Sequence, residues 1–244
     1  MSETALFVSD LHLCPSRPAA TDAFLEFLSG PARAAARLTI LGDLFEYWAG
    51  DDDLDDPFNA RICAALAGLG THGTRVAFIA GNRDFLVGEA FARAAGLSLL
   101  TDGCVFDVAG TPTLLLHGDT LCTDDAEYQR FRREVRGEPW CKAFLALPLS
   151  ERKAQIEALR RRSETEKQHK PMSIMDANAD AIAEAFRKSG CRRMIHGHTH
   201  RMAQHGVSVD GAACERWVLG DWYAAGNVLH CDGNGCRFVP LPFA

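Results

Sequence analysis

The stretch Leu38-Thr39-Ile40-Leu41-Gly42-Asp43 is a short apolar run that ends on a glycine and a carboxylate. A run of this length with such an ending is typical of a buried β-strand. Other segments share the design, each an apolar run that leads into an oxygen- or nitrogen-bearing side chain: 6–12, 76–82, 114–119 and 194–200. In open α/β sheets, ligands bind just beyond the carboxyl ends of the strands. We therefore expect these five strand endings to converge on one pocket.

The strand endings supply candidate metal ligands, which are Asp10, His12, Asp43, Asn82, His117, His198 and His200. This mixture of imidazole, carboxylate and amide oxygen suits a d-block divalent ion such as Mn2+, whereas structural zinc takes fewer ligands and prefers sulfur. The set is too large for one ion with an open position, so we predict two ions that share Asp43. If residues 198–200 are extended, His198 and His200 point the same way and one can reach each ion.

Each of these motifs is weak by itself. A lone Asp-x-His or His-x-His is more often a surface or packing feature, and a lone Gly-Asp or Gly-Asn is usually a turn. Here all of them occur in order, each directly after an apolar run, and the joint pattern favours a metal site. The remaining histidines are interpreted as ordinary polar residues, with His196 at most a neighbour of the ligands: His72, His169, His196, His205 and His230.

The chain has 244 residues, enough for a full hydrophobic core, and its net charge of -6 argues against a general nucleic-acid binder. Residues 124–170 carry 12 Lys/Arg and 9 Asp/Glu, a local excess of +3 that suits an anionic ligand or an anionic membrane face. Nothing in the sequence points to an obligate protein partner. The beginning of the chain does not resemble a secretion signal, and no apolar run is long enough to cross a bilayer. We expect a cytoplasmic protein for which attachment to a membrane surface stays open.

Nine cysteines occur without any CxxC pair or repeating framework. The nearest two, Cys231 and Cys236, stand in a glycine-rich turn and are too weak a signal for a metal site. We interpret the cysteines as small buried thiols of a reducing cytosol.

The element pattern predicts an α/β fold of two mixed sheets packed face to face, with helices outside. Short strands predicted at 97–100, 104–108 and 113–116 form a meander, because strands without intervening helices pair antiparallel. Thr21 and Asp22 are expected to cap the first helix, which residues 32–36 extend. Between Asp119 and Met194 no strand pattern occurs, so we predict a helical cap at 124–190 inserted in a core of residues 1–123 and 191–244.

The ordered motifs D-x-H, GD, GN, H and GH-x-H resemble the signature of the calcineurin-like metallophosphoesterases, over residues 8–200. The resemblance implies a four-layer α/β/β/α sandwich. It implies that one Mn2+ ion is held by Asp10, His12, Asp43 and His200, and a second by Asp43, Asn82, His117 and His198. Two such ions activate a bridging water for attack on phosphorus. On this resemblance the catalytic residues are Asp10, His12, Asp43, Asn82, Arg83 and His117.

Many members of the family continue GN with a histidine that protonates an alkoxide leaving group, whereas this chain has Arg83. Arginine keeps its proton but can neutralise phosphoryl charge and grip a second phosphate in a bidentate way. A phosphate leaving group needs no general acid, so we infer a pyrophosphate substrate. The alternative, that Arg83 merely pairs with Asp84, stays open.

Three longer stretches, 42–53, 117–132 and 174–178, resemble the branch of the family that hydrolyses UDP-2,3-diacylglucosamine, a lipid-linked sugar nucleotide, in lipid A synthesis. Ala177 stands where that branch usually has valine. The resemblance implies products lipid X and UMP, water attack at the UMP phosphorus, and a peripheral position on the cytoplasmic face of the inner membrane. It also implies a set of substrate contacts, namely Asn82, Arg83, Asp125, Tyr128, Ser163, Lys167, Lys170 and His198.

The predicted cap contains more apolar side chains than small helices need, among them Phe131, Trp140, Phe144, Leu145, Leu147 and Leu149. They either line a groove for two acyl chains or pack between the cap helices. Two alternatives stay open: another dimetal nucleotide pyrophosphatase or phosphodiesterase that acts on a soluble nucleotide, and a non-catalytic binding scaffold. Metal-dependent turnover lost in His12→Ala or Asn82→Ala would exclude the scaffold.

Overall fold

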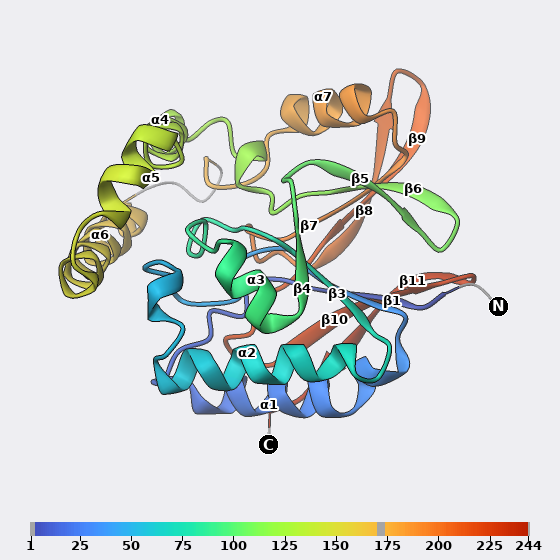
Figure 1. The fold of residues 1–244 in the computed structure, drawn as a ribbon. Coiled ribbons are helices and arrows are strands. Elements are labelled where there is room, and N and C mark those ends of the chain that lie inside the picture. Colours follow the sequence, from blue (N-terminus) through green and yellow to red (C-terminus); the bar gives the residue numbers. More distant parts are fainter. Residues whose placement is uncertain (1–2, 170–173, 244) are drawn as a thin grey trace.

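Two mixed β-sheets form the centre of the molecule (Figure 1). The computed structural model describes residues 3–169 and 174–243, with the backbone alone for 162–169. The six-stranded sheet has the order β11-β10-β1-β2-β3-β4, with β1–β4 parallel to one another. Its strands are β1 Ala5–Val8, β2 Arg37–Ile40, β3 Arg75–Ile79, β4 Leu97–Leu100, β10 Gly226–Asp232 and β11 Gly235–Leu241.

The five-stranded sheet has the order β5-β6-β7-β9-β8, in which β6, β7 and β9 are parallel neighbours. Its strands are β5 Cys104–Val108, β6 Thr111–Leu115, β7 Arg193–His196, β8 Ala203–Val209 and β9 Ala212–Val218. The helices are α1 Pro18–Ser29, α2 Pro57–Gly70, α3 Glu89–Ala95, α4 Ala126–Val135, α5 Glu138–Leu145, α6 Leu149–His169 and α7 Ala179–Ser189. Short 3-10 turns occur at η1 Pro31–Ala34, η2 Asp51–Asp53 and η3 Asp119–Leu121.

Three clusters of buried apolar residues separate the layers. Alternate residues of β1 serve two of them: Leu6 and Val8 pack toward α1–α3, whereas Ala5 and Phe7 pack toward the other sheet. The third cluster lies between the five-stranded sheet and α7, where Ile182 contributes. The order helix, sheet, sheet, helix is the predicted four-layer α/β/β/α sandwich (Figure 1).

Some local predictions were wrong. Helix α1 begins at Pro18 with Arg17 as its N-cap, so Thr21 lies inside the first turn and caps nothing. Pro31 begins a separate 3-10 turn instead of extending the helix, because proline offers no N–H to the preceding turn.

The predicted meander of residues 97–116 is also wrong. Strand β4 pairs parallel with β3 in the six-stranded sheet, and only β5 and β6 pair antiparallel with each other. The reason is helix α3, which supplies a crossover and ends at Gly96 with a left-handed backbone (φ 64°), so that the chain returns parallel to β3.

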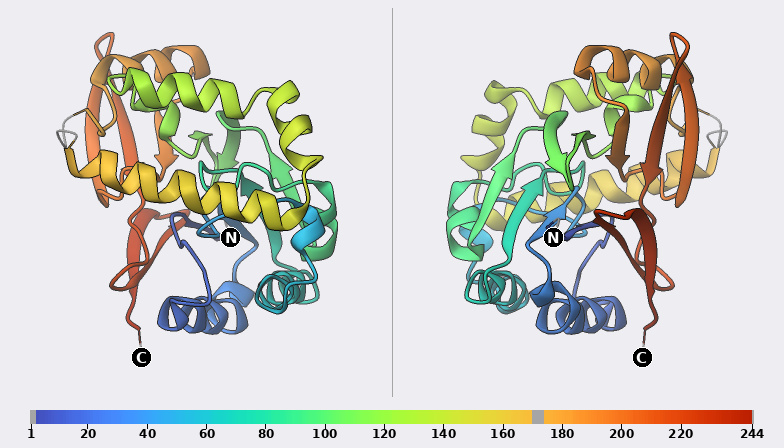
Figure 2. Two further views of the ribbon diagram at one scale, coloured as in Figure 1. Left: turned by 90° about the vertical axis from the view of Figure 1, so that its left-hand side faces the viewer. Right: turned by 90° about the vertical axis from the view of Figure 1, so that its right-hand side faces the viewer.

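Helices α4, α5 and α6 follow β6 and lie together at one side of the sandwich (Figure 2). Asp125 caps α4, since its carboxylate accepts the N–H of Tyr128 at 3.0 Å. Helix α7, which falls within the predicted cap range, packs on the five-stranded sheet. The division into core and cap stays a prediction. Among the described helices, none is both long and apolar enough to cross a bilayer.

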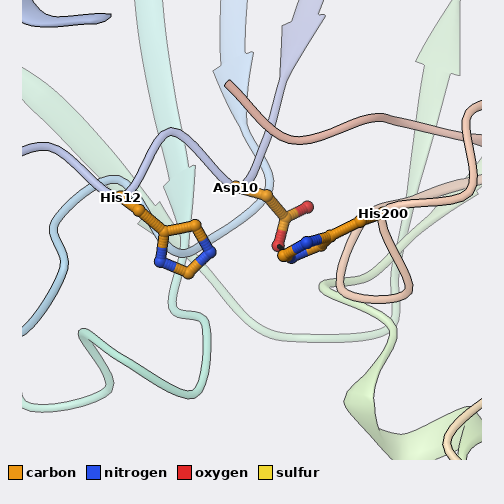
Figure 3. Close-up of side chains that lie close together, drawn as sticks. All are labelled: Asp10, His12 and His200. Atoms are coloured by element: carbon orange, nitrogen blue, oxygen red, sulfur yellow. Dashed lines mark ion pairs between the residues drawn. The ribbon is translucent and has the colours of Figure 1, made fainter. Parts of the chain in front are cut away.

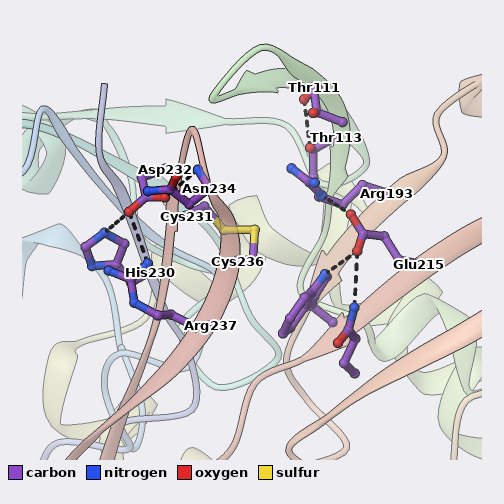
Figure 4. The surroundings of a disulfide bond; sticks show 12 residues. Thr111, Thr113, Arg193, Glu215, His230, Cys231, Asp232, Asn234, Cys236 and Arg237 are labelled. Atoms are coloured by element: carbon purple, nitrogen blue, oxygen red, sulfur yellow. Dashed lines mark hydrogen bonds and ion pairs between the residues drawn. A yellow bond between two sulfur atoms is a disulfide. The ribbon is translucent and has the colours of Figure 1, made fainter. Parts of the chain in front are cut away.

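Cys231 and Cys236 form a disulfide across the hairpin of β10 and β11, beside Asp232 and Arg237 (Figure 4). They were expected to be thiols. Strand register explains the difference, because it sets the two residues directly opposite each other. The other seven cysteines are free, as predicted.

Candidate metal centre

The predicted ligands gather at one edge of the sandwich, just beyond the carboxyl ends of β1, β2, β3, β6 and β7. Asp10, His12 and His200 bring ligand atoms within 4.8 Å of one another; Asp10 and His12 come from the loop after β1 and His200 from the loop after β7, and their side chains point toward one another (Figure 3). Asp10, Asp43 and His117 form a second such group. The convergence expected from the strand endings is therefore present in the fold.

Asp43 lies between two histidines. Its Oδ2 is 3.7 Å from His12 Nε2, and its Oδ1 is 3.7 Å from His117 Nε2. The two oxygens of this buried carboxylate therefore face different imidazoles, which suits a carboxylate shared by two cations.

Asn82 lies between His117 and His198. Its Oδ1 is 3.0 Å from His117 Nε2 and 2.8 Å from His198 Nδ1. The other nitrogen of His117, Nδ1, lies 2.8 Å from the carbonyl oxygen of Leu41, which fixes the ring and turns Nε2 toward the cluster.

Five predicted ligands have a left-handed backbone, an uncommon conformation for residues other than glycine. They are Asp10 (φ 56°), His12 (φ 49°), Asp43 (φ 53°), His198 (φ 67°) and His200 (φ 58°). Residues 198–200 do not form the extended segment considered for them, since β7 ends at His196 and both His198 and His200 have positive φ. The tight turn instead sends His198 toward Asn82 and His200 toward Asp10.

Glycines in the motifs allow the loops to approach one another. A Cβ atom on Gly81 would lie 2.2 Å from Asp43 Oδ1, and one on Gly197 would lie 2.2 Å from Asp10 Oδ2. Because Gly81 and Gly197 have no side chain, Asp43 and Asp10 can occupy the space beside them. The Gly-Asn and Gly-His motifs thus allow neighbouring predicted ligands to lie close together.

Opposite charges dominate the buried cluster. Burial alone would lower the pKa of His117, but nearby carboxylates, first Asp43, raise it to about 9. Burial alone would raise the pKa of Asp10, but neighbouring imidazoles, first His200, hold it well below its usual range. Burial and the neighbouring His117 lower the pKa of His198 to about 4. The buried carboxylates of Asp10 and Asp43 thus stabilise positive charge within the cluster of predicted ligands.

The donor set fits bound cations. His12 is 2% exposed, and within the described part of the chain both of its ring nitrogens lack a hydrogen bond. They face carboxylates of Asp43 at 3.7 Å and Glu46 at 3.4 Å instead. Buried polar atoms without partners carry a free-energy penalty that a metal ion bound to them would remove.

Asp84 is a structural member of the site that the sequence did not reveal. Its buried carboxylate accepts the backbone N–H groups of Gly81 at 2.8 Å and Leu44 at 2.7 Å. Burial and the neighbouring Asp43 raise the pKa of Asp84 to about 7. Asp84 therefore fastens the loop after β3 to the loop after β2.

Arg83 has a different carboxylate neighbour from the one considered. Its guanidinium lies 3.8 Å from Glu46 Oε1, whereas Asp84 is committed to backbone N–H groups, so the alternative that Arg83 merely pairs with Asp84 is wrong. Glu46 also contacts Arg160 of α6 at 2.8 Å. Sequence reasoning missed Glu46, since nothing in its spacing marks it.

Asp119 joins the site to helix α4. Its buried carboxylate accepts the hydroxyl of Tyr128 at 2.9 Å, Arg132 Nε at 2.6 Å and Arg136 at 3.3 Å, from one face of the helix. The Tyr128 ring stacks near His198, with centroids 5.9 Å apart. The sequence placed Asp119 after His117 but gave it no role.

Asp221 also escaped the sequence prediction, although a signal was present. Residues 217–221 form an apolar run that ends on Gly220 and Asp221, the same design as residues 38–43. Asp221 Oδ2 lies 3.2 Å from His200 Nδ1.

A cavity of about 510 Å³ opens beside these residues and continues between α4, α5 and α6. Its lining includes Asn82, Arg83 and His198 of the cluster as well as apolar side chains such as Phe131 and Trp140. Other predicted cap residues, Leu145, Leu147 and Leu149, are not among its lining residues.

The predicted substrate contacts differ in what the structure says about them. Asp125 and Tyr128 line the cavity. Ser163, Lys167 and Lys170 lie outside the residues whose side chains are described, so their contacts stay predictions.

Comparison with known proteins agrees with this geometry. A family model described as calcineurin-like phosphoesterase matches residues 4–202. A UDP-2,3-diacylglucosamine hydrolase of Aromatoleum aromaticum is 54% identical over 95% of this chain and 94% of its own length. A protein of the same name from Aeromonas hydrophila is 47% identical over 93% of this chain and 94% of its own length. One from Pseudomonas paraeruginosa is 46% identical over 98% of this chain and 99% of its own length. The chain therefore belongs to the calcineurin-like phosphoesterase family and is a metal-dependent hydrolase.

Proposed function

We propose that the chain hydrolyses the pyrophosphate bond of UDP-2,3-diacylglucosamine to give lipid X (2,3-diacylglucosamine 1-phosphate) and UMP. The observation that carries the proposal is the cavity, which runs from the ligand cluster to apolar side chains of the cap helices. A substrate with a charged pyrophosphate and two acyl chains matches both ends of this cavity. The substrate named for the relatives has both features.

In this proposal Asp10, His12, Asp43 and His200 would hold one Mn2+ ion, and Asn82, His117 and His198 would hold a second that shares Asp43. Bound divalent ions would polarise a phosphoryl oxygen and lower the pKa of a bound water toward neutrality, for attack at the UMP phosphorus. The buried carboxylates and the unsatisfied nitrogens of His12 support a cation site of this kind.

Arg83 would bind the phosphate group that leaves as part of lipid X. Its guanidinium lines the cavity next to Asn82 and has donors in a fixed fork, which suits two phosphate oxygens. Because that phosphate leaves as a stabilised anion, the chain needs no proton donor at residue 83. Ser163, Lys167 and Lys170 stay proposed contacts of the glucosamine phosphate.

We further propose that the enzyme works as a peripheral protein on the cytoplasmic face of the inner membrane, where its lipid substrate resides. Phe131, Leu145 and Leu159 are 41%, 42% and 39% exposed on the cap helices, whose surface is locally basic. Exposed apolar side chains among basic ones favour an anionic membrane surface.

The test is mass spectrometry of the products formed from UDP-2,3-diacylglucosamine in water enriched in heavy oxygen. We expect lipid X and UMP, with the heavy atom in UMP and none in lipid X. Label in lipid X would refute attack at the UMP phosphorus. Rapid hydrolysis of bis(p-nitrophenyl) phosphate without release of UMP would instead favour a general phosphodiesterase.

A further inference from the structure

His12 and His200, the two imidazoles that group with Asp10 in the first cluster, each have a second carboxylate facing their other nitrogen. His200 Nε2 faces Asp10 Oδ1 at 3.2 Å, while its other nitrogen faces Asp221 Oδ2 at 3.2 Å. His12 Nδ1 faces Glu46 at 3.4 Å. A carboxylate on one nitrogen of a histidine fixes the proton there and leaves the other nitrogen free to bind a metal.

The histidine on the other side of the cluster is supported differently. His117 Nδ1 lies 2.8 Å from the neutral carbonyl oxygen of Leu41. His198, also on that side, turns its Nδ1 to Asn82 Oδ1 at 2.8 Å. The side-chain carboxylate of Asp221 contacts His200 and the N–H of Tyr223, which places its support on the Asp10 side.

The loop that carries Asp221 is held in place by contacts that do not use its carboxylate. The N–H of Trp222 donates to the carbonyl of Asp10 at 3.1 Å, and Arg17 donates to the carbonyl of Trp222 at 2.6 Å. The N–H of Gly220 donates to Asn227 Oδ1 at 3.2 Å. Trp222 itself is fully buried against Phe24. A change of the carboxylate alone thus leaves the loop anchored.

The same loop also touches the second imidazole of this group. The ring of Tyr223 stacks on His12, with centroids 5.5 Å apart and an interplanar angle of 10°. One loop therefore supports both histidines on the Asp10 side, His200 through Asp221 and His12 through Tyr223.

We infer that Asp221 is a positioning residue for the ion held by Asp10, His12, Asp43 and His200, and that the ion held by Asn82, His117 and His198 does not depend on it. The inference rests on the two-ion arrangement of the proposed function. It does not rest on the identity of the substrate.

Asp221→Asn is the sharpest variant. Asp221 Oδ1 accepts the N–H of Tyr223 at 3.0 Å, and the asparagine oxygen keeps that bond. Its amide NH2 group then faces His200 Nδ1 and donates to it, which moves the imidazole proton to Nε2, the nitrogen required by the ion. Loss of such a supporting carboxylate lowers metal affinity about 10- to 100-fold.

The experiment measures Mn2+ binding by calorimetry and equilibrium dialysis, without substrate. Asp221→Asn is made in the wild-type chain, in Asn82→Ala and in His12→Ala. We expect the remaining ion of Asn82→Ala to bind about 10- to 100-fold more weakly when Asp221 is changed. The remaining ion of His12→Ala should bind unchanged.

Asp210→Asn is the matched control. It removes the same charge from an exposed turn, where Asp210 pairs with Arg187. Thermal unfolding checks that each variant folds, and Asp221→Ala must show the same selectivity as Asp221→Asn.

If Asp221→Asn weakened Mn2+ binding equally in the Asn82→Ala and His12→Ala chains, or in neither, the inference would be overturned. A wild-type chain that binds one ion would overturn the two-ion arrangement and this assignment with it. A chain that binds two ions selectively but leaves UDP-2,3-diacylglucosamine intact would refute only the proposed substrate.

Discussion

At the scale of single residues, the ligands are held by neighbouring loops more than by their own backbone preferences. A left-handed backbone costs a residue other than glycine about 1–2 kcal/mol. The N–H of Asp10 donates to the carbonyl of Gly42 at 3.1 Å, and that of His12 to the carbonyl of Asp43 at 2.9 Å. The N–H of His198 donates to Asp10 Oδ2 at 2.9 Å. Each loop thus stabilises the strained conformation of another.

Gly81→Ala tests how closely the loops must approach. The new Cβ would lie 2.2 Å from Asp43 Oδ1 and 2.4 Å from its backbone nitrogen, so Asp43 must move. We expect Mn2+ affinity to fall at least about tenfold and the free energy of unfolding to drop by about 1–3 kcal/mol. Calorimetry measures the Mn2+ affinity, and urea unfolding measures the free energy of unfolding. Gly68→Ala in α2 meets nothing within 4 Å and should stabilise the chain by about 0.5–1 kcal/mol. Wild-type Mn2+ affinity in Gly81→Ala would contradict the argument.

Arg83→Ala tests the phosphate grip. Loss of one donor to a developing phosphoryl charge typically lowers kcat about 10²- to 10³-fold. The kcat of Arg83→Lys should lie between those of the wild type and Arg83→Ala, because lysine keeps the positive charge but lacks the planar fork of donors. Metal content should not change, since the backbone N–H of residue 83 still donates to Asp43 Oδ1, a 2.8 Å bond. Steady-state kinetics with metal analysis checks this, and activity of Arg83→Ala equal to wild type would refute the role.

At the scale of elements, helix α6 contacts the rest of the molecule through a fully buried arginine, beside ion pairs of Lys153 and Arg160 and the packing of Ile156. Arg152 is 1% exposed and donates to the carbonyl oxygens of Leu147, at 3.0 Å, and Ala49, and it pairs with Asp52. The long helix is otherwise strongly polar, so propensity and pattern alone do not fix where it lies. Arg152 supplies that position.

Arg152→Leu should lower the free energy of unfolding by about 2–4 kcal/mol, since each buried carbonyl left without a donor costs about 1–3 kcal/mol. The neighbouring Lys153→Ala is the control. The side chain of Lys153 is 32% exposed and pairs with Asp53, so Lys153→Ala should lower the free energy of unfolding by no more than about 1 kcal/mol. Urea unfolding compares the two variants, and equal losses would show that Arg152 is no special anchor.

At the scale of the whole molecule, the cavity is formed jointly by loops of the sandwich and by the helices α4, α5 and α6. Its lining comes from the loops after β2, β3 and β7 and from the consecutive helices α4, α5 and α6. In the proposed function, the core ligands act on the pyrophosphate while the cap helices receive the acyl chains.

Phe131→Ser and Leu159→Ser test this division of roles. Both side chains line the cavity and are partly exposed, so the changes should alter binding more than stability. With long-chain substrate we expect kcat/KM to fall on the order of tenfold, since each buried methylene contributes about 0.8 kcal/mol. With a short-chain analogue the variants should match wild type. Val105→Ser, 50% exposed on β5, is the control. Equal losses on both substrates would refute an acyl groove.

The sequence by itself determined the strand endings and the candidate ligands that follow them. Short apolar runs that end on Gly-Asp, Gly-Asn or His are local signals, and a parallel sheet brings such endings to one edge whatever else the chain does. The element pattern also predicted two mixed sheets packed face to face with helices outside, and the resemblance of the ordered motifs implied the four-layer architecture that the fold has.

Only the tertiary structure decided which side chains support the ligands. Glu46, Asp84, Asp119 and Asp221 act through contacts between loops far apart in the sequence, and a carboxylate in such a loop looks like any other solvated residue. The pairing of β4 with β3 and the left-handed turn at His198 and His200 also depended on packing. Local sequence specifies which groups are present, but their partners follow from where the sheets and helices bring them.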